Sequence, residues 1–421
     1  MSKAAPRNTA RVLAGPPPSA GTESLKDHRA RLGPMPQVRH QEDAVALLEA
    51  SGLLGRGGAG FPVGKKWRSV AGHASGNAVV VVNGAESEPA SSKDRTLMVA
   101  RPQLILDGAQ LAATAVGADE IVVYVGVEHT RARAAMAHAI AERASERSAR
   151  RPTPIHLVEA PLGYVAGEAS AAVHYINARD ARPTNKPPRI SEVGVRGRPT
   201  LVQNVESLAH AALIARHGAE WFRSAGQGQT RGTAVITVSG SVTRPGVREI
   251  DLGTTIAEVA AYAGGAREGL QAVLLGGYFG AWSDLAETWD MPLDPVAMRA
   301  RNLSFGSGVV SFLPADACGV SATARIMAFM AGESAKQCGP CLYGLRAIAD
   351  ATQRLAIGGG RYDDLVRLER WSGQIAGRGA CGLPDGAVAF FQSALRVFSA
   401  EFRLHQAARR CSHPRAWAGV A

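Results

Sequence analysis

Segments with the pattern of buried strands alternate with segments patterned as amphipathic helices over residues 42–159. The run NAVVVVN at 77–83 is apolar at alternate and intervening positions alike, as expected of a strand covered on both faces. The expected order is helix 42–54, strand 77–83, helix 102–116, strand 120–125, helix 131–147 and strand 154–159. Such alternation predicts a parallel sheet with helices on both faces.

The pattern changes after residue 232. Two strand-like runs, TAVITVSG and VREIDLG, flank a Pro245-Gly246 turn, and a short helix at 254–262 and an apolar strand at 272–275 follow them. Strands that enclose one helix in this way predict a small β-grasp unit. From residue 315 onward the chain has a helical pattern, with segments expected at 320–332, 342–356, 362–376 and 386–407.

These patterns divide the chain into four parts. We expect a flexible N-terminal segment at 1–38, an α/β domain at 39–231, the β-grasp domain at 232–314 and a helical domain at 315–421. The first part is rich in proline, glycine and polar residues, which favours an extended or disordered chain. The expected fold class is α/β combined with α+β, ending in a bundle of helices.

The composition is that of a folded multidomain protein. The chain has 421 residues, 46% of them apolar, and no run approaches the roughly 18 apolar residues of a membrane span. Its N-terminus lacks the apolar core of a signal peptide, so we expect a cytoplasmic protein, peripheral to any membrane complex and not inserted into the membrane. The net charge of +11 comes from scattered arginines, which argues against nucleic-acid binding and favours nucleotides or an acidic partner.

Three of the five cysteines have the spacing of a metal centre. Cys338-Gly339-Pro340-Cys341 is followed at a distance by Cys381. Iron–sulfur clusters are commonly held by a closely spaced run of thiolates together with one distant cysteine. Such a run would place a further ligand three positions before Cys338, where the chain has Ala335. The sequence therefore predicts a cluster site that lacks one thiolate.

Other interpretations of the cysteines remain open. A thioredoxin-type dithiol would follow a strand, whereas residues 322–332 before Cys338 have helical character. Structural zinc usually takes four ligands, often as two pairs, and the spacing shows one pair. Inert buried thiols are the third interpretation, and we favour it for Cys318 and Cys411, which have no paired spacing.

Two loops in the α/β region have residues suited to a nucleotide. Residues 55–62, GRGGAGFP, contain G-x-G-x-x-G, but a helix rather than a strand precedes them, which disfavours an ordinary dinucleotide fingerprint. Their small residues still let backbone N–H groups approach an anion or a flat ring, and Lys66 follows. Residues 83–89, NGAESEP, follow a strand, where open sheets bind ligands, and Glu86 and Glu88 there suit ribose or ribityl hydroxyls. The alternative for the glycine loop is a purely structural turn, and the alternative for the acidic loop is a solvated turn.

Several longer segments resemble a known family. SGLLGRGGAGFPVGKKW, NGAESEPASSKDR, GYVAGEA at 163–169, KPPRISEVGVRGRPTLVQNVESL at 186–208, and the cysteine segments ESAKQCGPC and RGACGLPDG occur in this order. They are similar to the flavin loop, the acidic flavin and NADH loop and the later motifs of one family. This family is the NADH-binding flavoprotein subunit of respiratory complex I, with its relatives in NAD-linked hydrogenases and formate dehydrogenases. The resemblance extends over residues 45–408.

The resemblance implies a fold, cofactors and site residues. It implies a flavodoxin-like FMN domain, a β-grasp domain and a helical domain for a 4Fe-4S cluster. It also implies hydride transfer from NADH to FMN, then one-electron transfer through the cluster to a ferredoxin-like or thioredoxin-like 2Fe-2S partner subunit or a quinone-linked complex. It places Glu88 and Glu168 at the catalytic position. The implied cofactor contacts are Gly57, Gly58, Gly60, Phe61, Lys66, Asn83, Glu86, Tyr164, Gly167, Gln203, Asn204 and Ser207, and the implied cluster ligands are Cys338, Cys341 and Cys381.

Some positions depart from the family pattern. Ala335 stands where the family has a cluster cysteine, and Ala85 where it has an aspartate beside the flavin. Ala169 replaces a second glutamate, and Arg189 stands where an aromatic would lie near the adenine. Two further replacements, Gln203 and Ser207, are conservative. Cys411, His413 or an exogenous ligand would then complete the cluster. The departures leave a second hypothesis, a redox-inactive scaffold that docks a partner, and a third, thiol–disulfide exchange at Cys338 and Cys341.

Overall fold

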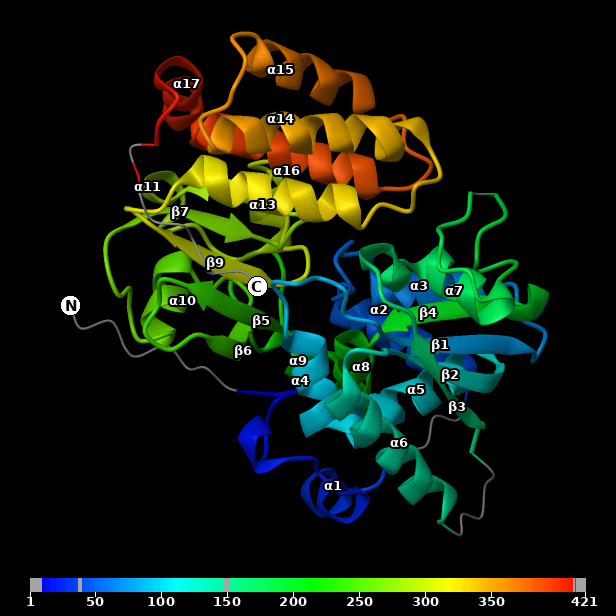
Figure 1. Cartoon of the computed structure of the whole chain (residues 1–421). Coiled ribbons are helices and arrows are strands. Elements are labelled where there is room, and N and C mark those ends of the chain that lie inside the picture. The colour runs from blue at the N-terminus through cyan, green and yellow to red at the C-terminus, as the bar shows by residue number, and fades with distance from the viewer. Residues whose placement is uncertain (1–9, 37–39, 147–151, 186, 412, 414–421) are drawn as a thin grey trace.

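The computed structural model of the chain describes residues 10–36, 40–146, 152–185, 187–411 and 413. Figure 1 shows a parallel sheet with its helices on one side of the molecule and a mixed sheet on the other, with the C-terminal helices stacked over the mixed sheet. This is the combination of α/β and α+β architecture that the sequence predicted.

A four-stranded parallel sheet has the strand order β3-β2-β1-β4. Because β1 lies inside the sheet with both faces covered, its valines are buried without interruption. Strand β4 was not predicted from the sequence; it pairs with β1 and brings Asn204 beside Asn83 at the carboxyl edge. The strands are β1 (Ala78–Gly84), β2 (Ala118–Gly126), β3 (Ile155–Ala160) and β4 (Thr200–Asn204).

Helices cover both faces of this sheet. Val80 and Val82 of β1 belong to the core formed with α2, α3, α5, α6 and α8, whereas Val79 and Val81 belong to the core formed with α7. The helices are α2 (Gln41–Ser51), α3 (Val63–Ala71), α4 (Lys93–Ala100), α5 (Pro102–Val116), α6 (Thr130–Ala144), α7 (Ala169–Ala178), α8 (Val205–His217) and α9 (Ala219–Arg223).

The second sheet has five strands in the order β6-β5-β9-β7-β8. β5 and β9 are parallel, and the other pairs are antiparallel. Ile256 and Val259 of α10 share a core with Ile236 and Phe312 of the sheet, which is the predicted β-grasp arrangement. The elements are β5 (Thr233–Gly240), β6 (Gly246–Asp251), α10 (Ile256–Tyr262), β7 (Leu270–Leu275), β8 (Ala281–Asp284), α11 (Leu285–Thr288), α12 (Pro295–Arg299) and β9 (Val309–Pro314).

The C-terminal helices follow the prediction except near their end. The single helix expected at 386–407 is wrong, because Phe398 leaves helical geometry at φ −104° and separates two helices. Its ring is buried and packs edge-on against Trp282, with 5.3 Å between ring centroids, so tertiary packing overrides a continuous helical pattern. The helices are α13 (Gly319–Gly332), a π-helix (Pro340–Leu345), α14 (Arg346–Ala356), α15 (Asp364–Ile375), α16 (Leu383–Val397) and α17 (Ser399–Ala408).

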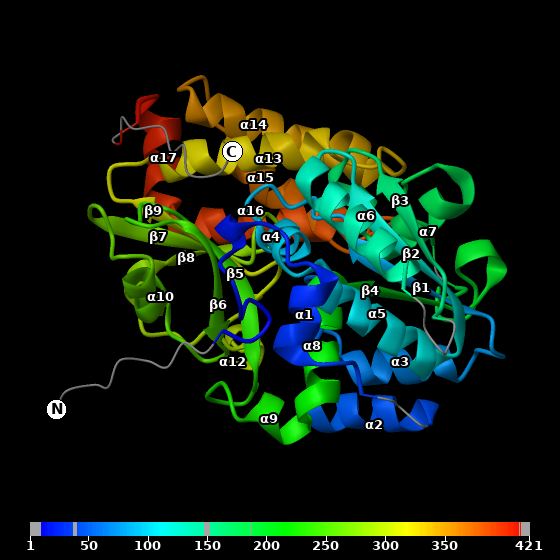
Figure 2. The ribbon, with the colours of Figure 1, turned by 90° about the horizontal axis from the view of Figure 1, so that it is seen from below.

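The N-terminal segment also corrects a prediction. The flexible chain expected at 1–38 is wrong for residues 10–36, which contain helix α1 (Leu25–Leu32). Figure 2 shows α1 lying against the helices of the parallel sheet, next to α5. Ahead of α1, the main-chain amides of residues 11–13 donate hydrogen bonds to the carboxylate of Glu249 on β6. The segment therefore contacts the mixed sheet and the helices that cover the parallel sheet.

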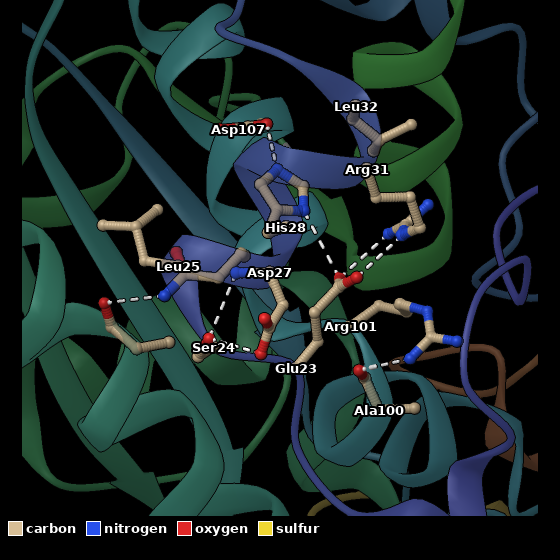
Figure 3. Close-up of polar contacts among 12 residues, drawn as sticks. Glu23, Ser24, Leu25, Asp27, His28, Arg31, Leu32, Ala100, Arg101 and Asp107 are labelled. Atoms are coloured by element: carbon tan, nitrogen blue, oxygen red, sulfur yellow. Dashed lines mark hydrogen bonds and ion pairs between the residues drawn. The ribbon is translucent and has the colours of Figure 1, made fainter.

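Polar contacts hold α1 in place (Figure 3). The buried ring of His28 lies between two carboxylates, with Nε2 2.8 Å from Asp107 Oδ2 and Nδ1 3.4 Å from Glu23 Oε2. Burial opposes a charge on His28, but these carboxylates outweigh it and raise its pKa. Arg31 Nε donates to Glu23 at 2.7 Å. Composition did not reveal this segment's structure because its anchors are long-range polar contacts rather than periodic apolar residues.

Candidate active site

A cavity of about 420 Å³ lies at the carboxyl edge of the parallel sheet, where β1 and β4 end. Its volume is within the range of small-molecule sites, roughly 300–1,000 Å³. The wall combines the glycine loop at 56–59, the acidic loop at 85–88 and the start of α16 at 381–383 with loops of the β-grasp unit. The parallel-sheet part, the β-grasp unit and the C-terminal helices therefore all contribute segments to one site.

The glycine loop between α2 and α3 presents its backbone to this cavity. Gly58 has φ +105°, and a Cβ there would meet no protein atom within 4 Å, so it would project into open space. Gly57 lies against Asn204, whose Cβ would be 3.2 Å from a Cβ added at Gly57. The Arg56 amide donates a 2.9 Å hydrogen bond to the buried Ser207 hydroxyl, which fixes the loop on α8. Ser207 therefore helps to position the glycine loop without lining the cavity itself.

The acidic loop is tied to two neighbouring elements. The Glu86 carboxylate accepts hydrogen bonds from the main-chain amides of Asp94 and Arg95 at 3.0 Å each, at the start of α4. Asn83 Nδ2 donates at 2.9 Å to the carbonyl of Gly167, which joins the end of β1 to the turn after β3. These contacts hold Glu86 and Asn83 in the cavity wall.

Glu88 is a buried carboxyl in the same wall, and its pKa is raised to about 7. Burial is the main cause, since desolvation disfavours the charged form, and the nearby Glu86 carboxylate adds to it. The Tyr278 amide and the Tyr164 hydroxyl each donate to Glu88 Oε2 at 2.9 Å and oppose the shift. A carboxyl that exchanges its proton near neutral pH is suited to respond to charge changes on a bound ligand.

A buried ion group lies beside the cavity. Lys93 Nζ is 2.6 Å from Asp94 Oδ1 and 2.9 Å from Glu206 Oε2. Burial raises the pKa of Asp94 to about 7 despite Lys93. At Glu206 burial is again the largest single influence, but Lys93, His210 and Arg56 together outweigh it and lower the pKa to about 2. Asn204 Nδ2 donates to Asp94 at 2.7 Å. Lys93 and Asp94 belong to the acidic motif but were not predicted to have a role, although a Lys-Asp pair after that loop was the available signal.

The turn after β3 places two predicted residues at the cavity. Tyr164 and Glu168 both line it, and Glu168 also accepts the amides of Ser170 and Ala171 at 2.7 and 3.0 Å as the N-cap of α7. The Phe279 ring packs edge-on against Tyr164, with 5.1 Å between centroids. Sequence reasoning missed Phe279, although the glycine-rich GGYFG directly after the strand β7 was a signal for a binding loop.

Other predicted contacts lie elsewhere around the glycine loop. Gly60 lines an adjoining cavity of about 540 Å³ that shares the glycine loop with the first. The Phe61 side chain is 56% exposed, Lys66 Nζ donates to the Val202 carbonyl, and Gln203 is buried in β4. The structure therefore brings residues of the glycine loop and the acidic loop together around one cavity. Ligand contacts by all of the predicted residues stay predictions.

The three clustered cysteines meet at the helical side of the cavity. Cys338 and Cys341 are hydrogen-bonded through their sulfurs, and the Ala380 amide donates to the Cys338 sulfur. Burial is the main cause that raises the pKa of Cys341 to about 12, and the electrostatic influence of Cys338 and Cys381 adds to it. Cys338 and Cys381 both pack against the core that contains Cys341. Cys381 itself lines the cavity. Thiols from two separate loops thus converge beside the glycine and acidic loops.

The surroundings of Cys338 and Cys341 are helical. Helix α13 precedes them, and Cys341 lies in the π-helix Pro340–Leu345. A thioredoxin-type dithiol instead follows a strand and opens an α-helix. The structure therefore agrees with the sequence argument against a dithiol site.

The suggestion that Cys411 or His413 completes the cluster is wrong. Cys341 and Leu355 are separated by most of the continuous helical run 340–356, a distance of about 20 Å at 1.5 Å per residue. The Leu355 carbonyl contacts His405, and His405 Nε2 lies within 4.8 Å of the Cys411 sulfur. Cys411 and the adjacent His413 are therefore at the far end of the helices from Cys341.

Comparison with known proteins places this architecture in a family. Residues 48–212 match the Nuo51 FMN-binding domain, residues 235–277 match the SLBB domain, and residues 321–405 match the NADH-ubiquinone oxidoreductase-F iron-sulfur binding region. The F 2 subunit of NADH-quinone oxidoreductase from Rhizobium meliloti (strain 1021) is 33% identical over 88% of this chain and 90% of its own length. The chain belongs to the family of NADH-quinone oxidoreductase F subunits.

Other F subunits and a solved structure agree. The F subunit of NADH-quinone oxidoreductase from Streptomyces coelicolor (strain ATCC BAA-471 / A3(2) / M145) is 31% identical over 88% of this chain and 84% of its own. An NAD⁺-reducing NiFe-hydrogenase in the H₂-reduced state matches with a TM-score of 0.79 and 29% identity over 89% of this chain. This chain spans 64% of that hydrogenase chain. The family and fold predicted from the resemblance are confirmed.

The cavity fits the flavin of this family. Gly58 leaves open space where any side chain would intrude, and a Cβ on Gly167 would lie 2.7 Å from the Ala85 carbonyl oxygen. A Cβ on Gly277 would likewise lie 2.7 Å from the Glu88 carboxylate. Glycine at these positions lets three loops close around the site while it stays hollow. As members of this family do, the chain carries an FMN-binding domain and a 4Fe-4S region.

The cysteine group fits an iron–sulfur cluster through three sulfurs. Thiolates are the usual ligands of such clusters, and main-chain N–H groups that donate to the sulfurs are part of how proteins tune them. The amides of Ala380 and Cys341 donate to the Cys338 sulfur, and that of Leu383 donates to Cys381.

Within the described residues, no helix is both long and apolar enough to cross a membrane.

Proposed function

We propose that this chain oxidises NADH at a bound FMN and passes the electrons singly through its iron–sulfur cluster to a partner subunit. The observation that carries the proposal is the shared cavity, whose wall contains Gly58 of the glycine loop, Glu88 of the acidic loop and the cluster cysteine Cys381. Electron transfer between two cofactors requires that they be close, and one cavity with both sets of residues supplies that proximity. The protein's task is to bind and align the groups that carry the redox chemistry.

Different residues of the cavity bind and align the flavin and the dinucleotide in this proposal. Bound FMN supplies a hydride acceptor that can release electrons one at a time. The glycine loop presents backbone to the flat ring, and Asn83, Glu86 and Asn204 offer polar groups for its side chain. The exposed phenyl ring of Phe61 is available to stack on an incoming nicotinamide. Glu88 and Glu168 face the same space and position the dinucleotide.

The cluster in this proposal is held by three thiolates from the protein. Cys338, Cys341 and Cys381 supply them, and Ala335 stands where the fourth would be. An exogenous ligand then completes the coordination of one iron, which leaves that iron exchangeable. We expect a cluster that loses iron more readily in air than one with four cysteines.

The other replacements change the charge beside the flavin. Ala85 and Ala169 remove two carboxylates that the family pattern would place there, while Glu86 and Glu168 remain in the wall. Less negative charge near a flavin stabilises its reduced, anionic form and weakens repulsion of the dinucleotide phosphates. We infer a flavin that accepts electrons more readily than in relatives with both carboxylates.

The electron acceptor in this proposal is a ferredoxin-like or thioredoxin-like 2Fe-2S subunit, which can belong to a quinone-linked complex. Leu342 and Tyr343 support a protein partner near the cluster, because they follow Cys341 directly and are 42% and 77% exposed. The net charge of +11 favours an acidic partner.

Reconstitution without oxygen tests the proposal. The chain is incubated with FMN, iron and sulfide, desalted, and analysed for flavin, iron and visible absorbance before and after NADH is added. We expect bound flavin that bleaches with NADH, and several irons per chain. The Cys338→Ser variant should lose iron but keep flavin that NADH bleaches, because Cys338 lies outside the flavin wall. A protein that stays colourless, or flavin that NADH does not reduce, would overturn the proposal.

A further inference from the structure

A second group of metal-binding side chains lies apart from the cavity. Cys318, His405 and Cys411 each place one ligand atom so that all three atoms are within 4.8 Å of one another. Cys318 is the N-cap of α13, His405 lies in α17, and Cys411 follows that helix. Cys318 and His405 are buried, and Cys411 is partly exposed. Two thiols and an imidazole in one small volume form a donor set typical of zinc.

The tautomer of His405 favours metal binding. Its Nδ1 lies 2.9 Å from the carbonyl oxygen of Leu355, which can only accept, so Nδ1 carries a hydrogen. In the neutral ring the lone pair is then on Nε2, which lies 3.4 Å from the Cys318 sulfur. Metal-ligating histidines usually donate their other ring N–H to a carbonyl or carboxylate in this way. The ring is therefore held with its free lone pair toward the sulfurs.

Both sulfurs also receive main-chain hydrogen bonds. The Ser321 amide donates to Cys318 Sγ at 3.3 Å, and the His413 amide donates to Cys411 Sγ at 3.3 Å. The Ser321 donor stabilises Cys318 as a thiolate, which is the form that binds metal. The Cys411 thiol instead donates to the His413 carbonyl at 2.9 Å, so it has to release its proton when a metal binds. The Glu401 carboxylate adjoins the group and accepts the Gly319 amide at 2.8 Å. The same Glu401 oxygen lies 3.7 Å from His413 Nδ1.

We propose that Cys318, His405 and Cys411 bind one thiophilic divalent cation of the zinc class, separate from the iron–sulfur cluster. The two cysteines lie outside the matched iron–sulfur region at 321–405, and the long helices place the group far from Cys341. The fourth coordination position is taken by water or by a small movement of Glu401. Bound there, the ion fastens the chain after α17 to the start of α13 and stabilises the helical layer. This proposal does not depend on the redox function.

Metal analysis of paired variants tests the site. Zinc and iron are measured in the full chain, purified without chelators and reconstituted with iron and sulfide, and in Cys411→Ser and Cys341→Ser. We expect about one zinc per chain, lost in Cys411→Ser with iron unchanged, and the reverse in Cys341→Ser. Cys411 is partly exposed and follows the last helix, so its substitution leaves the core intact. Circular dichroism confirms that both variants are folded.

Cobalt gives a spectroscopic measurement that does not depend on zinc supply. Co²⁺ bound by two thiolates and an imidazole has intense visible and charge-transfer bands that aqueous Co²⁺ lacks. In a chain with Cys338, Cys341 and Cys381 all replaced by Ser, we expect these bands to saturate at one equivalent. Cys411→Ser in that background should weaken cobalt binding at least about tenfold. Cobalt bands unaffected by Cys411→Ser, or a Cys318–Cys411 disulfide found by mass spectrometry in protein isolated under reducing conditions, would overturn the proposal.

Discussion

The Tyr164 hydroxyl donates a 2.9 Å hydrogen bond to Glu88 Oε2, which joins the turn after β3 to the loop after β1. The Tyr278 amide, from the loop after β7, donates to the same oxygen at 2.9 Å. One buried carboxyl therefore connects the parallel sheet with the β-grasp unit at the wall of the cavity. Its protonation state affects both the stability of this junction and the charge that a ligand meets.

Replacing Glu88 by glutamine should change how stability depends on pH. Folding raises the pKa of Glu88 from 4.5 to about 7, so between these values the folded protein holds a proton that the unfolded chain releases. The Glu88 contribution to the free energy of unfolding therefore falls as pH rises through this window, by up to about 3 kcal/mol, and is constant above it. Denaturant titrations of flavin-free wild type and Glu88→Gln should show their difference changing only within the window.

The exposed Glu369 on α15 provides a matched control. Glu369→Gln removes a carboxylate that is not buried, so its stability should follow the wild type at each pH. If Glu88→Gln also ran parallel to the wild type, the raised pKa of Glu88 would be wrong.

Gly58→Ala should weaken FMN binding at least about tenfold, because a left-handed conformation costs alanine roughly 1 kcal/mol or more and its methyl group would enter the cavity. Gly52→Ala is the matched control, since Gly52 also has positive φ with open space around a Cβ but caps α2 away from the cavity. Both variants should lose similar stability, and only Gly58→Ala should lose flavin affinity in fluorescence-quenching titrations. Equal affinities in the two variants would contradict the assignment of this loop to FMN.

Lys93→Met should destabilise the folded chain by about 3–5 kcal/mol, because it leaves the Asp94 and Glu206 carboxylates buried without their shared cation. Urea denaturation near neutral pH measures the loss. The double variant Lys93→Met/Glu206→Gln removes one of the uncompensated charges and should recover part of the stability. No recovery in the double variant would show that the ion pair is not the cause.

His28→Gln should destabilise the N-terminal segment most strongly at low pH. Folding raises the pKa of His28 above 6.5, so its charged form stabilises the fold below 6.5 and this contribution is lost as pH rises through the folded pKa. The expected loss is about 3 kcal/mol at low pH. Limited proteolysis within residues 10–36 and denaturant titration at acidic and alkaline pH measure it. The exposed His73→Gln is the control, and equal sensitivity of both variants would contradict the role given to His28.

Parts of the fold could be predicted because their signals are local. The valine run of β1 needs only neighbouring residues to show that both faces are covered, and the helix at 102–116 agrees with the prediction at both ends. Where the outcome depended on distant partners, prediction failed. Phe398 breaks a helix because Trp282 lies beside it, and residues 10–36 fold because Asp107 and Glu249 accept their donors.

The candidate site shows the same division. The glycine loop, the acidic loop and the Cys338-x-x-Cys341 pair were recognisable because each is a short run with its own chemistry. Phe279 and Lys93 were missed as wall residues because their importance comes from segments that meet only in space.

The amino-acid sequence by itself determined the alternating layers, the family resemblance and the ligand types available for flavin and iron, since these depend on periodicity and on short ordered motifs. Only the tertiary structure decided that Cys381 faces the flavin cavity and that Cys411 joins Cys318 and His405 instead of the cluster. The physical reason is chain path: Cys318 and His405 are 87 positions apart, and only the packing of α13, α14 and α17 brings their atoms into contact.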